Sequence, residues 1–135
     1  MINNNYMQNI MKQLISTNSA PAAIGPYSQA IEINGVIYLS GMLPIDCVTG
    51  NFVSGGIKEQ TTQIFVNIKA VLSVAGVNID NVVKTTVFLS EMSLFEGMNQ
   101  VYSTQFKEPF PARSTVAVKG LPKNALVEIE VIAVK

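Results

Sequence analysis

Glu128 and Glu130 are the side chains whose spacing most directly suggests chemistry. They stand two residues apart in a run rich in β-branched residues (LVEIEVIAV), so in a strand both project from one face, about 6 to 7 Å apart. A carboxylate pair of this kind could perform acid–base catalysis. The separation touches the range used by inverting glycosidases, but the chain has no Trp to stack on a sugar ring. Two structural alternatives stay open, a solvated face and a buried ion pair with Lys or Arg113.

Arg113 is the only arginine in the chain. It lies in PFPARST (residues 109–115), where two prolines restrict the backbone ahead of strand-forming residues. A planar, bidentate contact to a carboxylate or phosphate can therefore come from this side chain alone. An anion anchor and an interface arginine paired with a glutamate are equally good interpretations.

Several familiar kinds of site are excluded or disfavoured by the remaining residues. The chain has no histidine, which excludes Ser-His-Asp and Cys-His nucleophiles and His-ligated metal sites. Cys47 has no second cysteine with which to form a disulfide or hold a metal and no histidine to activate its thiol, so we interpret it as incidental. Gly55-Gly56 lacks a phosphate-binding motif and is interpreted as a flexible start to a helix. Tyr27 could line a pocket or cover the edge of the core.

The composition indicates one globular domain that associates with a partner. Of 135 residues, 48% are hydrophobic and only 13% are charged, about half the usual charged fraction, so we expect part of the uncharged surface to be covered. Nine basic residues balance nine acidic ones, and no basic stripe follows a phosphate backbone, which argues against nucleic acid. No window is apolar enough for a membrane span.

The N-terminal segment, residues 1–12, is Asn-rich and lacks the features of a signal peptide, so we predict a mobile tail before a single domain at 13–135. One cysteine fits a reducing compartment, and we expect a cytoplasmic protein. An organelle address in the tail, or an alternative start at Met7 or Met11, stays open.

Hydrophobic periodicity predicts six strands and two helices. We expect strands at residues 13–16, 30–33, 36–40, 82–89, 113–119 and 126–134. The dipeptide Asn34-Gly35 predicts a tight hairpin turn. A helix should begin after Gly56 and end at Gly76, with Lys58, Glu59, Gln63 and Asn67 facing solvent. A second should follow a capping box of Ser93 and Glu96 and end before Pro109.

This order of elements predicts an α+β fold in which two helices cover one face of a mixed sheet. The last strand carries apolar residues on both faces, since Val127, Ile129, Val131 and Ala133 alternate with Leu126, Ile132 and Val134. We therefore expect the uncovered face to meet another subunit.

Five segments carry a resemblance to a known family. They are PAAIGPYSQA (21–30), LSG (39–41), VKTTVFL (83–89), PFPARSTV (109–116) and EIEVIAV (128–134). From about Ile15 to Lys135 the chain resembles the reactive intermediate deaminase family, RidA/YjgF. The resemblance implies a chorismate-mutase-like subunit, a homotrimer with ligand sites between neighbouring subunits, and no metal or organic cofactor. It also implies hydrolysis of 2-iminobutanoate and 2-iminopropanoate, released by pyridoxal-phosphate-dependent dehydratases, to 2-oxo acids and ammonia.

The resemblance also implies roles for individual residues. Arg113 stands where the family anchors the substrate carboxylate, and Glu128 where it orients and deprotonates water. The other positions implied to line the pocket are Tyr27, Ser40, Gly41, Asn99 and Thr115. Thr115 replaces a frequent Cys, and the short segment between Phe106 and Phe110 could change the cleft rim and the substrate range. Glu130 is expected to be structural or interfacial.

Two other functions have been attached to relatives. One is a non-catalytic, small-acid-binding or chaperone-like trimer, and the other is RNA cleavage. A binder would need Arg113 but not a water-activating carboxylate, so the presence of both residues favours the enzyme. Zero net charge argues against RNA.

Overall fold

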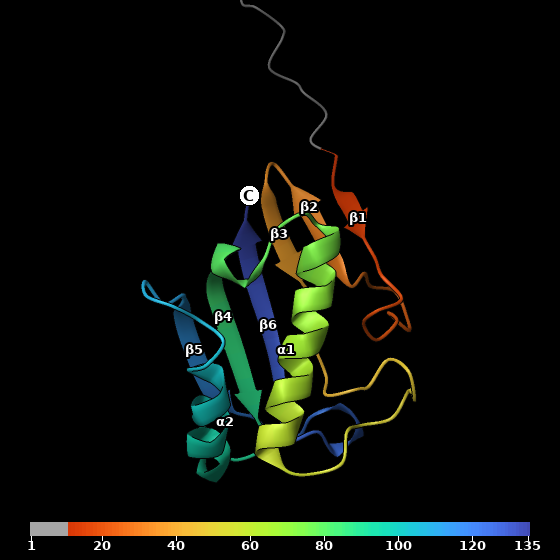
Figure 1. The fold of residues 1–135 in the computed structure, drawn as a ribbon. Coiled ribbons are helices and arrows are strands. Elements are labelled where there is room, and N and C mark those ends of the chain that lie inside the picture. The colour runs from red at the N-terminus through yellow and green to blue at the C-terminus, as the bar shows by residue number, and fades with distance from the viewer. Residues whose placement is uncertain (1–10) are drawn as a thin grey trace, which may run out of the picture.

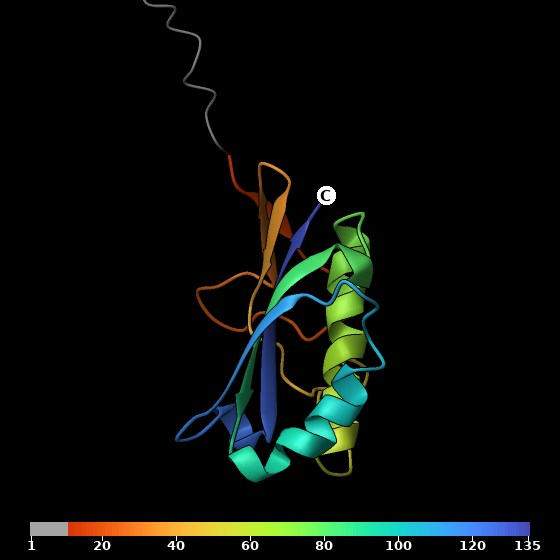
Figure 2. The same ribbon diagram turned by 90° about the vertical axis from the view of Figure 1, so that its left-hand side faces the viewer.

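A six-stranded mixed sheet is the centre of the structure, a computed structural model that describes residues 11–135 (Figure 1). Its order is β1-β2-β3-β6-β4-β5. The strands are β1 (Gln13–Ile15), β2 (Ala30–Ile33), β3 (Val36–Leu39), β4 (Val82–Leu89), β5 (Ala112–Ala117) and β6 (Val127–Val134); the helices are α1 (Ile57–Val74) and α2 (Phe95–Tyr102). Both helices lie on the same side of the sheet, as Figure 2 shows, so the predicted α+β architecture is confirmed. Most of the N-terminal tail that the sequence predicts, residues 1–10, lies outside the described residues.

β2 and β3 form the hairpin that Asn34-Gly35 predicts. Ile33 pairs with Val36, so only two residues make the turn. Their φ angles are 50° for Asn34 and 79° for Gly35, both in the left-handed region that a type I′ turn needs. This turn sets the register of β3, whose far end leads into the pocket described below.

β6 lies inside the sheet and pairs antiparallel with β3 and β4. Buried and more exposed side chains alternate along β6 as the sequence predicts. Four residues face the helices and are at most 1% exposed: Val127, Ile129, Val131 and Ala133. The residues between them, Glu128, Glu130 and Ile132, project from the opposite face. β4 pairs with β5 on its other side in parallel, and α2 lies within the crossover between these two strands.

α1 supplies most of the helical side of the core. Ile64, Phe65, Ile68, Val71 and Leu72 are at most 1% exposed. The helix stops where the sequence predicts: Gly76 has φ 78°, and its N–H donates to the Ser73 carbonyl.

One prediction for α1 is wrong. Asn67, expected in solvent, is fully buried, because its amide donates to backbone carbonyls of a neighbouring loop. Hydrophobic periodicity assigns Asn to the surface and gives no information on hydrogen-bond partners that are distant in sequence.

The predicted capping box before α2 does not form. A 3₁₀ turn, Met92–Leu94, precedes the helix, and the Ser93 hydroxyl donates to the Glu91 carboxylate instead. At α1 half of such a box forms: the Gly56 N–H donates to the Glu59 carboxylate at 2.8 Å, while glycine has no side chain to accept in return. α2 also ends earlier than predicted, at Tyr102 rather than just before Pro109, although Phe106 beyond it is buried.

Aromatic packing joins the helices to β4. Phe65 meets the rings of Tyr102 and Phe106 edge to face, with centroids 5.8 and 5.7 Å away. The Tyr102 hydroxyl and the buried Thr85 hydroxyl of β4 are 2.8 Å apart and hydrogen-bonded. This contact holds α2 against the β4–β5 half of the sheet.

Within residues 11–135, no helix covers the opposite face of the sheet. It exposes Tyr38, Val116 and Val134 by 47%, 45% and 38%. A shallow hollow of about 210 Å³ lies there between Tyr38, Lys84, Thr86 and Glu130. The expected cover by another subunit stays a prediction.

None of the helices in the described part of the chain is both long and apolar enough to cross a membrane.

We expect Ile68→Ala to lower the free energy of unfolding by about 2 to 5 kcal/mol, because Ile68 is fully buried in α1 and its truncation leaves a cavity. Val66→Ala is the matched control, since Val66 is 53% exposed on the same helix and should change stability by less than about 0.5 kcal/mol. Chemical denaturation measures both. Equal losses would show that the core is not where the structure has it.

Candidate active site

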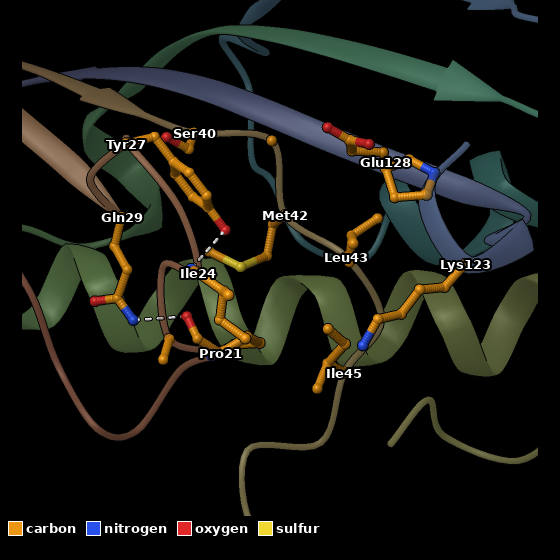
Figure 3. Close-up of a pocket in the computed structure, with 13 residues that line it drawn as sticks. Pro21, Ile24, Tyr27, Gln29, Ser40, Met42, Leu43, Ile45, Lys123 and Glu128 are labelled. Atoms are coloured by element: carbon orange, nitrogen blue, oxygen red, sulfur yellow. Dashed lines mark hydrogen bonds between the residues drawn. The ribbon is translucent and has the colours of Figure 1, made fainter. Parts of the chain in front are cut away.

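A pocket of about 540 Å³ opens beside the start of β6 (Figure 3). Three backbone segments supply its walls: the loop before β2, the segment after β3, and the turn before β6. The lining residues are Pro21, Ala22, Ile24, Tyr27, Gln29, Ser40, Gly41, Met42, Leu43, Ile45, Pro122, Lys123 and Glu128. Four of the predicted site residues therefore meet here: Tyr27, Ser40, Gly41 and Glu128.

Gln29 holds the loop before β2 in place. This side chain is 5% exposed; its amide donates to the carbonyls of Thr17, Ala20 and Pro21, and its oxygen accepts from the Thr17 N–H at 2.7 Å. A buried amide with its donors and acceptor occupied fixes a loop that has no regular hydrogen bonding of its own.

Tyr27 and Ser40 project from these walls. The Tyr27 hydroxyl accepts a hydrogen bond from the Ile24 N–H, which keeps the ring over the loop while leaving it 53% exposed. The Ser40 hydroxyl donates to the Ser28 carbonyl at 2.6 Å, tying the end of β3 to the same loop. The open question for Tyr27 is thus decided: it lines the pocket.

Glu128 lies against the backbone of Gly41. Met42 forms two backbone hydrogen bonds with Ile129, at 2.8 and 3.3 Å, so the segment after β3 runs beside β6. A Cβ atom on Gly41 would lie 2.8 Å from the Glu128 carboxyl carbon, a distance that a real Cβ does not adopt. Glycine at position 41 is therefore what gives the carboxylate its room.

The carboxylate is held in an environment that disfavours its charge. Burial raises the pKa of Glu128 above its ordinary value, and the negative charge of Glu130 raises it further. Among residues 11–135, no cation lies within ion-pair distance of Glu128. A carboxyl with a raised pKa exchanges protons more readily near neutral pH, which suits a general acid or base.

Arg113 lies elsewhere in the subunit. Its guanidinium donates to the Asn99 side-chain oxygen at 2.7 Å and lies over the rings of Tyr102 and Phe95, 4.5 and 5.5 Å from their centroids. Thr115, two residues on, has a buried hydroxyl without a hydrogen-bond partner. Arg113, Asn99 and Thr115 thus form a second cluster, which leaves most donors of the arginine free.

The two clusters lie on opposite faces of the sheet. Arg113 pairs with Thr85, whose side chain is buried beneath α2, whereas Glu128 pairs with Phe88 on the other face of β4. Two strand spacings of about 4.8 Å and three residues of about 3.3 Å separate the backbones of Arg113 and Glu128 by about 14 Å. Within one chain the fold therefore does not bring Arg113 and Glu128 together.

Among the lining residues that sequence reasoning did not name, two have polar side chains, Gln29 and Lys123. Gln29 lies within the segment 21–30 that carries the resemblance, but a glutamine in a loop does not by itself indicate that it lines a pocket. Lys123 lines the pocket from a left-handed turn (φ 54°), and within residues 11–135 no carboxylate lies at ion-pair distance from it. The sequence Pro122-Lys123-Asn124 is typical of a turn, but it does not indicate that the Lys123 side chain lines the pocket.

The remaining candidates do not join the pocket. Cys47 is exposed and borders a neighbouring hollow of about 360 Å³. Gly55 has φ 117° and lies under the Glu59 side chain, so it serves the capping of α1. Within the described part of the chain, no group of three His, Cys, Asp or Glu side chains could hold a metal ion.

The chain is similar in sequence and in structure to several known proteins. A family model described as Endoribonuclease L-PSP matches residues 17–135. A mouse protein named 2-iminobutanoate/2-iminopropanoate deaminase is 45% identical over 129 residues, which cover 96% of each chain. The crystal structure of YyfA from Yersinia pestis, described as a protein of unknown function of the conserved Rid protein family, superimposes with a TM-score of 0.90 at 52% identity and covers 93% of this chain and 100% of that one. E. coli TdcF, crystallised with bound serine, gives a TM-score of 0.86 at 36% identity, covering 91% of this chain and 98% of its own.

Replacing Glu130 by Gln should lower the pKa of Glu128, because it removes the like charge that resists ionisation. A pH titration of the Glu128 carboxyl carbon by ¹³C NMR measures this directly. Asp80→Asn is the control: it removes a negative charge from an exposed position beyond the opposite end of β6 and should leave that titration unchanged. An unaltered midpoint in Glu130→Gln would mean that the two carboxylates do not interact.

Proposed function

The chain belongs to the reactive intermediate deaminase family, and we propose that it hydrolyses reactive 2-imino acids, such as 2-iminobutanoate and 2-iminopropanoate, to 2-oxo acids and ammonia. The observation that carries this proposal is Glu128, a carboxyl with a raised pKa that lies in an apolar pocket with no ion-pair partner in the described part of its own chain. Removal of such imines protects pyridoxal-phosphate enzymes from damage.

The chemistry needs a water, a base and a group that returns the proton. The oxygen of a water molecule bonds to C2 of the iminium, R–C(=NH₂⁺)–COO⁻, while the Glu128 carboxylate takes a proton from that water. The carboxylic acid then gives that proton to the amino nitrogen of the tetrahedral intermediate. The C–N bond breaks, the hydroxyl proton returns to solvent or departs with the ammonia, and the products are R–CO–COO⁻ and NH₄⁺. These steps use no metal and no organic cofactor.

Arg113 is the proposed anchor for the substrate carboxylate. Its bond to Asn99 and its contact with the Tyr102 ring fix the plane of the guanidinium while further N–H donors stay free for an anion. The unpartnered Thr115 hydroxyl lies on the same strand and face and could bind the same ligand.

The separation of Arg113 from Glu128 supports a site built by two subunits. We propose that the chain forms a homotrimer in which the Glu128 pocket of one subunit faces the Arg113 cluster of the next. In a closed ring each subunit uses one patch of each kind, so three equivalent sites result. The uncovered apolar face of the sheet is the natural surface for this contact.

A non-catalytic binder of small acids is the second candidate, and the serine bound by E. coli TdcF favours it. Such a binder would have no use for a desolvated carboxylate, which repels an acidic ligand unless it takes part in proton transfer. Glu128 therefore favours the enzyme. RNA cleavage, which the description of the matching family model names, fits poorly with zero net charge. We propose a cytoplasmic location, supported by the single, unpaired cysteine.

The reaction can be tested with a coupled assay. Threonine dehydratase generates 2-iminobutanoate, and semicarbazide traps whatever imine remains. Wild type should suppress trapping, whereas Arg113→Ala and Glu128→Gln should reduce the effect by about 100-fold or more, because anchoring and proton transfer are each worth that much. Glu32→Gln, which loses a carboxylate paired with Lys135 far from the pocket, should behave as wild type. No suppression by wild type with several imino acids would favour the binder.

The two-subunit site makes a separate prediction. Arg113→Ala and Glu128→Gln should each be inactive alone, but hybrids formed by co-expression and purified through two different tags should recover activity. A trimer that carries both tags holds two subunits of one variant and one of the other, so about one third of the sites should recover, because one junction in three joins an intact glutamate from one subunit to an intact arginine from the next. Hybrids as inactive as the parents would show that both residues act within one subunit.

A further inference from the structure

Two buried amide side chains on α1 reach the segments that flank Glu128, although neither belongs to the pocket. Gln60 is 7% exposed and Asn67 is fully buried. Seven residues are almost two helical turns, so both side chains leave the same face of α1, about 10 Å apart. An apolar side chain would be expected at either position.

Asn67 holds the segment after β3. Its amide group donates to the Leu43 carbonyl at 3.1 Å and to the Ile45 carbonyl at 2.9 Å. Both residues line the pocket, and Gly41, whose Cα faces the Glu128 carboxylate, lies two residues before Leu43. The segment is thus fixed on one side by Asn67 and on the other by the two hydrogen bonds between Met42 and Ile129.

Gln60 holds the start of β6. Its side-chain oxygen accepts from the Leu126 N–H at 2.9 Å, across 66 residues of sequence. Leu126 lies between the turn that carries Lys123 and the strand that carries Glu128, two residues further on. The Leu126 carbonyl accepts from the Ser90 N–H, so both backbone polar groups of this residue are occupied.

We propose that Gln60 and Asn67 are positioning residues: α1 uses them to fix, from outside the pocket, the backbone on both sides of the Glu128 carboxylate. General acid–base catalysis depends on this placement, because a displacement of about 1 Å can lower a rate 100-fold. The expected changes in kcat rest on the proposed function, whereas the expected changes in hydrogen exchange and in the Glu128 resonance do not.

Gln60 offers a pair of variants that separates positioning from packing. Gln60→Glu keeps an oxygen that can accept from Leu126, whereas Gln60→Met keeps the length of the side chain and loses the acceptor. We expect Gln60→Met to lower kcat about tenfold with KM within about threefold, and Gln60→Glu to retain most of kcat.

Asn67→Asp turns two donors into acceptors at nearly unchanged volume and should lower kcat in the same way. Asn81→Asp is the matched control: the Asn81 amide donates to the Val134 carbonyl at 2.9 Å, beyond the opposite end of β6, so this change should leave kcat unaltered. Thermal unfolding of every variant checks that it is folded.

Two readouts do not depend on activity. Amide hydrogen exchange should become faster at Met42 in Asn67→Asp and at Leu126 in Gln60→Met, and the ¹³C resonance of the Glu128 carboxyl should shift in both variants and not in Asn81→Asp. If wild type hydrolyses no imine, the proposed function fails, and exchange and resonance still decide the positioning role. Folded Asn67→Asp and Gln60→Met proteins with wild-type exchange and an unmoved Glu128 resonance would overturn the inference, as would an unchanged kcat.

Discussion

The two-residue alternation of β6 is the constraint on which the other features depend. Hydrogen bonds to β3 and β4 on both sides leave the strand no freedom of register, and a slip of one residue would move two glutamates into the core. Burial of Val127, Ile129 and Val131 therefore fixes where Glu128 points. The helices pack against one face of this strand, β3 and β4 flank it within the sheet, and Glu128 projects from the opposite face to line the pocket.

The Glu128 pocket lowers the stability of the folded chain. A half-buried carboxylate close to a second one is unfavourable, and the surrounding structure must hold it there. The means are backbone contacts: Gly41 leaves the space, Met42 bridges to Ile129, and the amides of Gln29, Gln60 and Asn67 occupy the polar groups of three irregular segments. Loops of this kind carry function well because rigid elements fix them at several points.

The two clusters of the proposed site lie on different faces of a single chain. The Arg113 cluster lies under α2 at the β5 edge, and the Glu128 pocket lies on the far face beside β3. The same subunit leaves an apolar sheet face without a cover. In the proposed trimer, one contact would both bury the apolar face and bring the Glu128 pocket of one chain to the Arg113 cluster of the next.

The sequence by itself determined the strands, the hairpin, the extent of α1 and the alternation of β6, because all of these follow from local periodicity and turn chemistry. The resemblance in its motifs pointed to Tyr27, Ser40, Gly41 and Glu128, which the fold then brought into one pocket. Local patterns failed at Asn67 and at the Ser93 capping box, where a partner distant in sequence or a competing acceptor decided the outcome. Only the tertiary structure could place Gln29 and Lys123 at the pocket and Arg113 on the other face from Glu128, because side-chain direction across a sheet depends on which strands become neighbours.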